Sequence, residues 1–68
     1  MTQDQKKMFG EAVSQSRKAL GMTQIACAKQ CGVSIVSFQN WERGVCAPRS
    51  DKMQMICDIL NLNREDFE

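Results

Sequence analysis

The 68-residue chain contains no histidine, no glycine-rich phosphate loop and no apolar run close to the roughly 20 residues that a membrane-spanning helix needs. Histidine is the commonest general base, and the carboxylates of this chain are scattered along faces that we expect to be solvated. These absences predict that the protein is not an enzyme and that it binds no small-molecule substrate, no cofactor and no membrane. The polar start, MTQDQKK, precedes no apolar segment, so we expect no signal peptide and a cytoplasmic location.

A strong charge of one sign is also absent, because 9 Lys and Arg against 8 Asp and Glu leave a net charge of +1. This balance argues against a uniformly basic surface. The two signs are nevertheless unevenly distributed. Acidic side chains gather near the end of the chain, at Asp58, Glu65, Asp66 and Glu68. Basic side chains lie nearer its middle, at Lys18, Arg43 and Arg49. The numbers are compatible with a molecule that has one basic face.

Without a secretory signal, the four cysteines do not predict a disulfide framework. Cys27 and Cys31 have a spacing that loosely fits zinc, but Cys46 and Cys57 form no second close pair. The same spacing places Cys27 and Cys31 one turn apart on an apolar helix face, where free cysteine packs as a small hydrophobe. We favour core packing over metal binding or redox chemistry, and expect no metal site. Cys46 differs because it lies in an expected loop, and it is the one candidate for a reactive thiol.

Composition is otherwise typical of a globular domain, with 43% apolar and 25% charged residues. A chain of this length forms one domain, which we place at residues 1–68, and its core supplies only ~3–5 kcal/mol of stability. The chain ends soon after its last expected helix, so we expect no second domain for dimerisation or ligand sensing.

The central stretch TQIACAKQCGVSIVSFQNWERG, residues 23–44, predicts two short helices joined by a tight turn. Thr23 can cap a helix that begins at Gln24. Gly32 can adopt the positive φ that ends this helix, and Ser34 can cap the next one, which runs over residues 35–43. The side chains expected to point inward are Ile25, Cys27, Ala28, Cys31, Phe38, Trp41 and Glu42. This outline is that of a helix-turn-helix.

Helices are also expected on both sides of this stretch. Thr2 and Gln5 form a capping-box pattern for a first helix that runs to about Leu20 and ends at Gly21. Gly10 costs this helix up to ~1 kcal/mol relative to alanine. Its expected inward stripe is Phe9, Ala12, Val13, Ser16 and Leu20. Ser50 is the expected N-cap of a fourth helix over residues 51–60. The inward stripe of that helix is Met53, Ile56, Cys57 and Leu60. A last turn over residues 64–68 returns Phe67 to the core. The fold class is therefore all-α, a compact domain of four to five helices.

The outward face of the third helix carries Ile35, Val36, Gln39 and Asn40. In a DNA major groove an apolar side chain can contact the thymine methyl group, and Asn or Gln can pair with adenine. This combination suits a site that contains A·T pairs. Gln24 has two interpretations that the sequence leaves open: a solvated surface residue, or a phosphate contact at a helix N-terminus.

The segments LGMTQ, AC-A, CGVS and FQNWERG, with a proline four residues after the last, resemble the Cro/cI-type helix-turn-helix family. The resemblance covers roughly residues 17–62. It implies a phage repressor-like (lambda repressor-like) fold and DNA binding. Two departures stand out: Ile35 and Val36 replace polar residues common at base-contacting positions, and the net charge of +1 is low. Phe38 also replaces a usual Ile or Val.

The resemblance also implies roles for individual residues. Gln24 corresponds to a glutamine that contacts a phosphate at the start of the second helix, with Thr23 beside it. The base-facing positions correspond to Ser34, Ile35, Val36 and Asn40, with Gln39 next to them. The positions that contact backbone phosphates correspond to Ser37, Arg43 and Arg49. Arg17 and Glu42 correspond to an internal ion pair that joins the first and third helices.

We expect a transcriptional regulator, most simply a repressor that binds a pseudo-palindromic operator in double-stranded DNA as a homodimer and occludes a promoter. One alternative is a protein-interaction module, such as an antitoxin or an antirepressor, that uses Ile35, Val36 and the loop at residues 45–47 as its partner surface. A second alternative is a sensor in which Cys46 switches the dimer. The same loop and the end of the fourth helix are the expected dimer surface.

Overall fold

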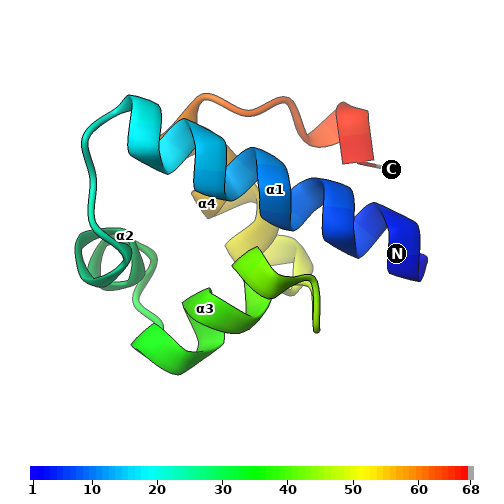
Figure 1. Cartoon of the computed structure of the whole chain (residues 1–68), viewed down its shortest axis with the longest axis horizontal. Helices are drawn as coiled ribbons and strands as arrows, with labels where there is room; N and C mark the ends of the chain where they lie inside the picture. The colour runs from blue at the N-terminus through cyan, green and yellow to red at the C-terminus, as the bar shows by residue number, and fades with distance from the viewer. Residues whose placement is uncertain (68) are drawn as a thin grey trace.

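The computed structural model describes residues 1–67 and contains four α-helices and one short 3₁₀ helix. They are α1 (Gln3–Ala19), α2 (Gln24–Cys31), α3 (Ile35–Arg43), α4 (Ser50–Leu60) and η1 (Arg64–Phe67). Figure 1 shows α1 lying across the molecule, with α3 beneath it and α2 seen end-on beside α3. The all-α fold expected from the sequence is confirmed. Glu68, the end of the expected last turn, lies outside the described residues.

Side-chain caps fix where three of the helices begin. The Thr2 hydroxyl accepts from the Gln5 backbone N–H at 3.1 Å, and the Gln5 side chain accepts from the Thr2 backbone N–H at 2.7 Å. Thr23 caps α2 in the same manner, and Ser34 caps α3. At the end of α2, Gly32 has a φ of 69°, which a side-chain-bearing residue adopts only with strain. These caps define both helices of the motif.

The start of α4 differs from the expectation. Ser50 is the first helical residue and not the N-cap, which is Arg49 and makes no side-chain cap hydrogen bond. The Ser50 hydroxyl instead accepts from Arg64 Nη2 at 2.6 Å, so that it joins α4 to η1. The expected cap was therefore wrong because a tertiary hydrogen bond competes for the same hydroxyl.

Apolar side chains from all five helices form one core. Its members are Phe9, Val13, Cys27, Ala28, Cys31, Phe38, Trp41, Met53, Ile56, Cys57, Leu60 and Phe67. Phe67 returns to this core as expected, and its ring meets that of Phe9 edge to face at a centroid distance of 5.2 Å. The contact between these two rings therefore packs η1 against α1.

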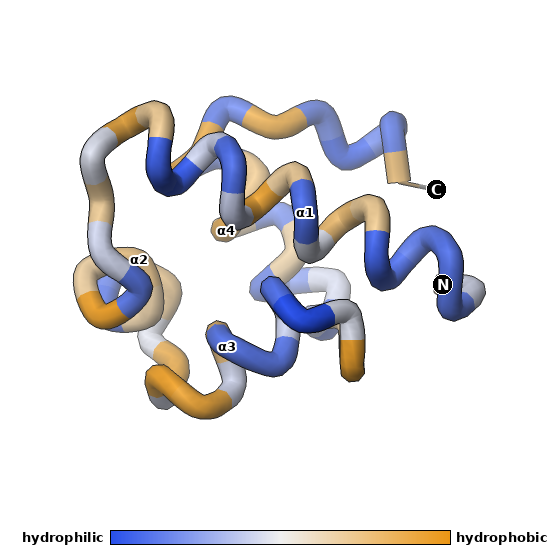
Figure 2. Tube along the Cα trace, viewed as in Figure 1, coloured by the Kyte–Doolittle hydropathy of each residue, from blue (hydrophilic) through white to orange (hydrophobic). Residues whose placement is uncertain are grey.

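Two residues that we expected inside are exposed. Leu20 is 50% exposed because it is the C-cap of α1, where the chain already turns away from the core. Ile25 is 58% exposed because it lies roughly 110° around α2 from the mean direction of Cys27, Ala28 and Cys31, at about 100° per residue. Figure 2 shows that the start of α3 is also apolar and lies at the periphery of the molecule.

The cysteines divide as expected into three buried thiols and one exposed thiol. Cys27, Cys31 and Cys57 are packed in the core, and Cys46 is exposed in the loop after α3. Burial raises the pKa of the Cys27, Cys31 and Cys57 thiols above their ordinary value, which keeps them protonated and poorly nucleophilic. Within residues 1–67 no group of three or more His, Cys, Asp or Glu side chains is arranged to hold a metal ion.

Thiol titration tests this division. We expect an aromatic disulfide reagent to modify one thiol per chain rapidly in the folded protein at neutral pH, and all four after unfolding in urea, because only Cys46 is accessible. Cys46→Ser should remove the rapid reaction and leave three thiols that react on unfolding. Rapid modification of two or more thiols in the folded wild type would contradict the packing of the core.

The helices of residues 1–67 include none that is both long enough and apolar enough to cross a membrane.

Candidate nucleic-acid interface

An ion pair between α1 and α3 holds the two helices together at the base of the candidate interface. Arg17 Nε donates to Glu42 Oε2 at 2.7 Å, and Arg17 Nη2 donates to Glu42 Oε1 at 3.4 Å. Arg17 Nη1 donates to the Met22 carbonyl at 2.9 Å. The side chains of Arg17 and Glu42 are only 11% and 8% exposed. The pair expected from the resemblance is therefore present and nearly buried, and each guanidinium nitrogen of Arg17 donates one hydrogen bond.

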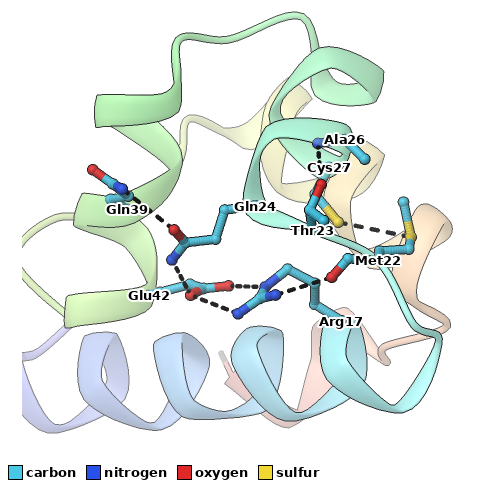
Figure 3. A network of polar contacts seen from close by, with 8 residues as sticks. All are labelled: Arg17, Met22, Thr23, Gln24, Ala26, Cys27, Gln39 and Glu42. Atoms are coloured by element: carbon cyan, nitrogen blue, oxygen red, sulfur yellow. Dashed lines mark hydrogen bonds and ion pairs between the residues drawn. The ribbon is translucent and has the colours of Figure 1, made fainter.

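The polar network continues from this pair into α2 and back to α3 (Figure 3). Gln24 Nε2 donates to Glu42 Oε1 at 2.8 Å, and Gln39 Nε2 donates to Gln24 Oε1 at 3.3 Å. The Gln24 side chain therefore lies inside a tertiary network, which neither interpretation of the sequence foresaw. One of its two amide hydrogens is donated to Glu42, and none of the hydrogen bonds among the described residues uses the other.

Gly10 allows α1 to approach α3 beneath this network. A Cβ atom at position 10 would lie 2.5 Å from the Trp41 carbonyl oxygen and 2.6 Å from the Glu42 carbonyl oxygen. Both neighbours are backbone atoms and cannot move without displacing α3. From the sequence, Gly10 was expected only to weaken α1. In the structure, its lack of a side chain allows the close contact that sets the position of α3.

The outward face of α3 is narrower than the sequence predicted. Val36 is 60% exposed, but Ile35 is partly buried and packs against the core, which corrects the expectation that both are exposed. Asn40 and Arg43 follow Val36 at helical spacing. Neither the Asn40 amide nor the Arg43 guanidinium has a hydrogen-bond partner among the described residues. We call Val36, Asn40 and Arg43 the outward stripe.

The hydroxyl groups at the starts of α2 and α3 serve as caps. Thr23 Oγ1 accepts from the Ala26 backbone N–H, and Ser34 Oγ accepts from the Ser37 backbone N–H, each at 3.1 Å. Ser34 Oγ and Ser37 Oγ also lie 3.1 Å apart within hydrogen-bond distance. These three residues, expected at the DNA, therefore also hold the ends of the helices in place.

A shallow hollow of about 370 Å³ lies between α3 and the start of α4. Its lining includes Ser37, Asn40, Cys46, Arg49 and Lys52, so it joins the outward stripe to the loop before α4. Lys52 Nζ also donates to the Cys31 carbonyl at 2.9 Å, at the end of α2. Sequence reasoning missed Lys52, although its place one turn after Arg49 was a signal for it. Arg49 and Lys52 supply positive charge beside the outward stripe, and the carboxylate of Asp51 lines the same hollow.

A protein-family model and a curated relative each match most of this chain. Residues 13–67 match a protein-family model described as helix-turn-helix. The chain is also 28% identical over 57 residues to the cryptic phage CTXphi transcriptional repressor RstR of Vibrio cholerae serotype O1, across 84% of this chain and 51% of that protein. It therefore spans about half the length of this curated relative.

Two crystal structures of the clp gene regulator ClgR from Corynebacterium glutamicum are similar to the chain. The TM-scores are 0.82 and 0.79, each at 24% identity over 93% of this chain. The match covers 67% of the one ClgR chain and 82% of the other. At this identity the likeness shows that the fold is shared.

Proposed function

The chain belongs to the Cro/cI-type helix-turn-helix family, and on that premise we propose that it is a sequence-specific transcriptional repressor that inserts α3 into the major groove of its operator. Regulators of this family are not enzymes, in agreement with the expectation from the sequence. The binding unit is the single domain of residues 1–68. A DNA target also implies action in the cytoplasm.

The observation that carries the proposal is the contrast between the two faces of α3. Its inner face is fixed by Phe38 and Trp41 in the core and by the ion pair of Glu42. Its outward stripe presents an apolar side chain, an amide and a guanidinium without partners among the described residues. An exposed helix face of this kind, with Arg49 and Lys52 beside it, matches the chemistry of a DNA groove flanked by phosphates.

The contacts that we propose fall into two classes. Backbone phosphates are contacted by Thr23, Gln24, Ser37, Arg43 and Arg49, which set the register of the protein on the duplex. The network supports this for Gln24, because Glu42 and Gln39 fix the orientation of its amide at a helix N-terminus. Bases are contacted from the start of α3, the region of residues 34–40.

We propose that two copies bind a pseudo-palindromic site, with their α3 helices in successive major grooves about 34–36 Å apart. Each copy adds a modest affinity, because the net charge of one chain is only +1. Occupancy of such a site over a promoter would exclude RNA polymerase. The exposed Val45, at 61%, lies in the loop that we propose as part of the dimer surface.

Selection from a randomised duplex pool at near-physiological salt tests the proposal. The expected result is an enriched two-fold-symmetric sequence whose half-sites lie one helical turn apart, bound by two chains per duplex. No enrichment by a folded protein would contradict it. That outcome would favour a protein-interaction module, such as an antitoxin or an antirepressor, in which Val36 and the 45–47 loop contact a protein partner.

Arg49→Ala should weaken binding to every sequence by a similar factor, because a phosphate contact carries no base information. The slope of log K against log salt concentration should become shallower by ~0.9 per chain, or ~1.8 for a bound dimer. The measurement is fluorescence anisotropy over a series of salt concentrations, with Arg49→Lys as a charge-conserving control that keeps the slope. An unchanged slope for Arg49→Ala would rule out a phosphate contact.

A further inference from the structure

Lys52, the third residue of α4, contacts the end of α2. Its Nζ donates to the Cys31 carbonyl at 2.9 Å, in a partly buried hydrogen bond. Cys31 is the last residue of α2, and Lys52 follows it by 21 positions in the chain. The bond therefore joins α4 to the point where the helix-turn-helix motif enters its turn.

The Cys31 carbonyl is one that α2 itself leaves without a partner. The backbone N–H groups of Gly32 and Val33 donate to earlier carbonyls of α2, at 3.1 Å and 3.0 Å. Among the described residues, the backbone hydrogen bonds of this turn do not include the Cys31 carbonyl. The last carbonyls of a helix form the negative end of its dipole, which a cation stabilises. Lys52 supplies both the hydrogen bond and the positive charge.

The turn between α2 and α3 leads directly to the outward stripe. Gly32 ends α2, Ser34 caps α3, and the stripe begins two residues later at Val36. A Cβ atom at Gly32 would lie 3.4 Å from Lys52 Nζ, so the ammonium group lies against the turn as well as against the end of α2. Movement of this turn would therefore move the start of α3.

The two ends of α3 are held by different contacts. Its second half is held by Trp41 in the core, by the ion pair of Glu42 and by the close approach of Gly10. Near its start, Ile35 is only partly buried against the core. Among the described residues, the Lys52 bond is the one hydrogen bond that joins α4 to the helix-turn-helix motif. The start of α3 therefore depends more on the position of the turn than its end does.

On the basis of the proposed function, we infer that Lys52 is a positioning residue for DNA recognition. Through the Cys31 carbonyl it fixes the turn of the motif, and so it sets the direction in which the start of α3 enters the groove. Its ammonium group has two further N–H donors, so a phosphate contact would add to this role and not replace it. A misdirected helix loses base contacts, which need a defined geometry, before it loses phosphate contacts, which carry no base information.

Backbone ¹⁵N relaxation of the free protein tests the structural step without DNA. Lys52→Met removes the ammonium group and keeps an unbranched stem, and circular dichroism verifies that the variant is folded. We expect the order parameters of residues 32–36 to fall from ~0.85, the value of rigid backbone, to about 0.6. Those of residues 38–42 should stay at ~0.85, because the core and the ion pair of Glu42 hold them.

Two further variants isolate the hydrogen bond. Lys52→Arg keeps a donor and the positive charge, and should retain the order parameters of the wild type. Lys29→Met is the matched control, because Lys29 is an exposed cation in the last turn of α2 whose side chain makes no hydrogen bond among the described residues. It should leave the order parameters of residues 32–36 unchanged. Loss of rigidity in Lys52→Met alone therefore reports the bond to the Cys31 carbonyl.

DNA binding measures the consequence for recognition. For Lys52→Met we expect the affinity for the selected duplex to fall about tenfold, the effect of one lost base contact, and the affinity for an unselected duplex to fall less than about threefold. Lys52→Arg should bind both duplexes like the wild type. The ratio of the two affinities is the readout that a general loss of stability would not move in a folded variant.

Two results would overturn the inference while leaving the proposed function intact. The first is unchanged order parameters at residues 32–36 in Lys52→Met. The second is an equal loss of affinity for both duplexes together with a salt slope shallower by ~0.9 per chain, the signature of a phosphate contact alone. Failure of the pool to yield any selected duplex would instead overturn the proposed function itself, whereas the relaxation measurements need no DNA.

Discussion

Glu42→Gln should lower the free energy of unfolding by about 3–5 kcal/mol, because it leaves the nearly buried guanidinium of Arg17 without its counter-charge. The Glu42 carboxylate accepts two hydrogen bonds from Arg17 and one from Gln24. Glutamine has a single acceptor oxygen, and its amide nitrogen would face one of these donors. Since a core of this size supplies only ~3–5 kcal/mol, much of the variant should be unfolded at 25 °C.

Urea titration followed by the fluorescence of Trp41, the one tryptophan, measures this loss. Glu11→Gln is the matched control, because Glu11 is exposed on α1 and its replacement should change stability by less than ~0.5 kcal/mol. The double variant Arg17→Met with Glu42→Leu removes both charges and should recover at least half of the loss. Equal stability of Glu42→Gln and wild type, or a double variant that is no more stable than Glu42→Gln, would contradict the coupling.

Gly10→Ala should destabilise the protein by up to ~3 kcal/mol, the upper end of what overpacking costs. In an unconstrained helix the same change stabilises by ~0.5–1 kcal/mol, so the sign of the effect is diagnostic. The reason is steric: the new methyl group would lie 2.5 Å from the Trp41 carbonyl oxygen and push α3 away from α1. Calorimetry or urea titration gives the sign directly.

Glu11→Ala provides the comparison for Gly10→Ala, because it places alanine at the next position of α1 on an exposed site. That variant should be as stable as wild type or slightly more stable. DNA binding adds a second readout. At temperatures where Gly10→Ala remains folded, its affinity for the selected duplex should fall, since α3 is displaced. A Gly10→Ala protein with higher stability and unchanged affinity would mean that α1 and α3 are not in close contact there.

The local signals in the sequence were sufficient for the helices of the motif. Thr2, Thr23 and Ser34 cap helices where expected, because an N-cap depends on a hydroxyl and on backbone N–H groups two or three residues away. Ser50 failed as a cap because its partner, Arg64, comes from a distant part of the chain. Helical periodicity placed Phe9, Phe38 and Ile56 in the core. It does not show how much of the apolar face of a helix is covered by a neighbouring helix.

The sequence predicted one contact of the candidate site and missed others. The resemblance named Arg17 and Glu42 as a pair, and the structure contains it. Neither pattern nor resemblance revealed that Gln39 bonds Gln24, because this bond exists only after α2 and α3 are packed. The close approach at Gly10 is likewise invisible in a sequence, where the glycine is merely a weak helix former. Tertiary geometry, rather than residue type, decides which polar side chains of α3 are available to DNA.

The most direct test of the central claim, that the outward side of α3 binds DNA, is a chemical-shift titration of ¹⁵N-labelled protein with the selected duplex. We predict that the largest amide shifts fall on residues 23–24, 34–43 and 49. We expect no shift at Met1, Met53 and Phe67, which line a second hollow of about 310 Å³. Shifts that are largest around Met53, Arg64 and Phe67, with α3 unchanged, would contradict the claim and place the binding surface at this second hollow.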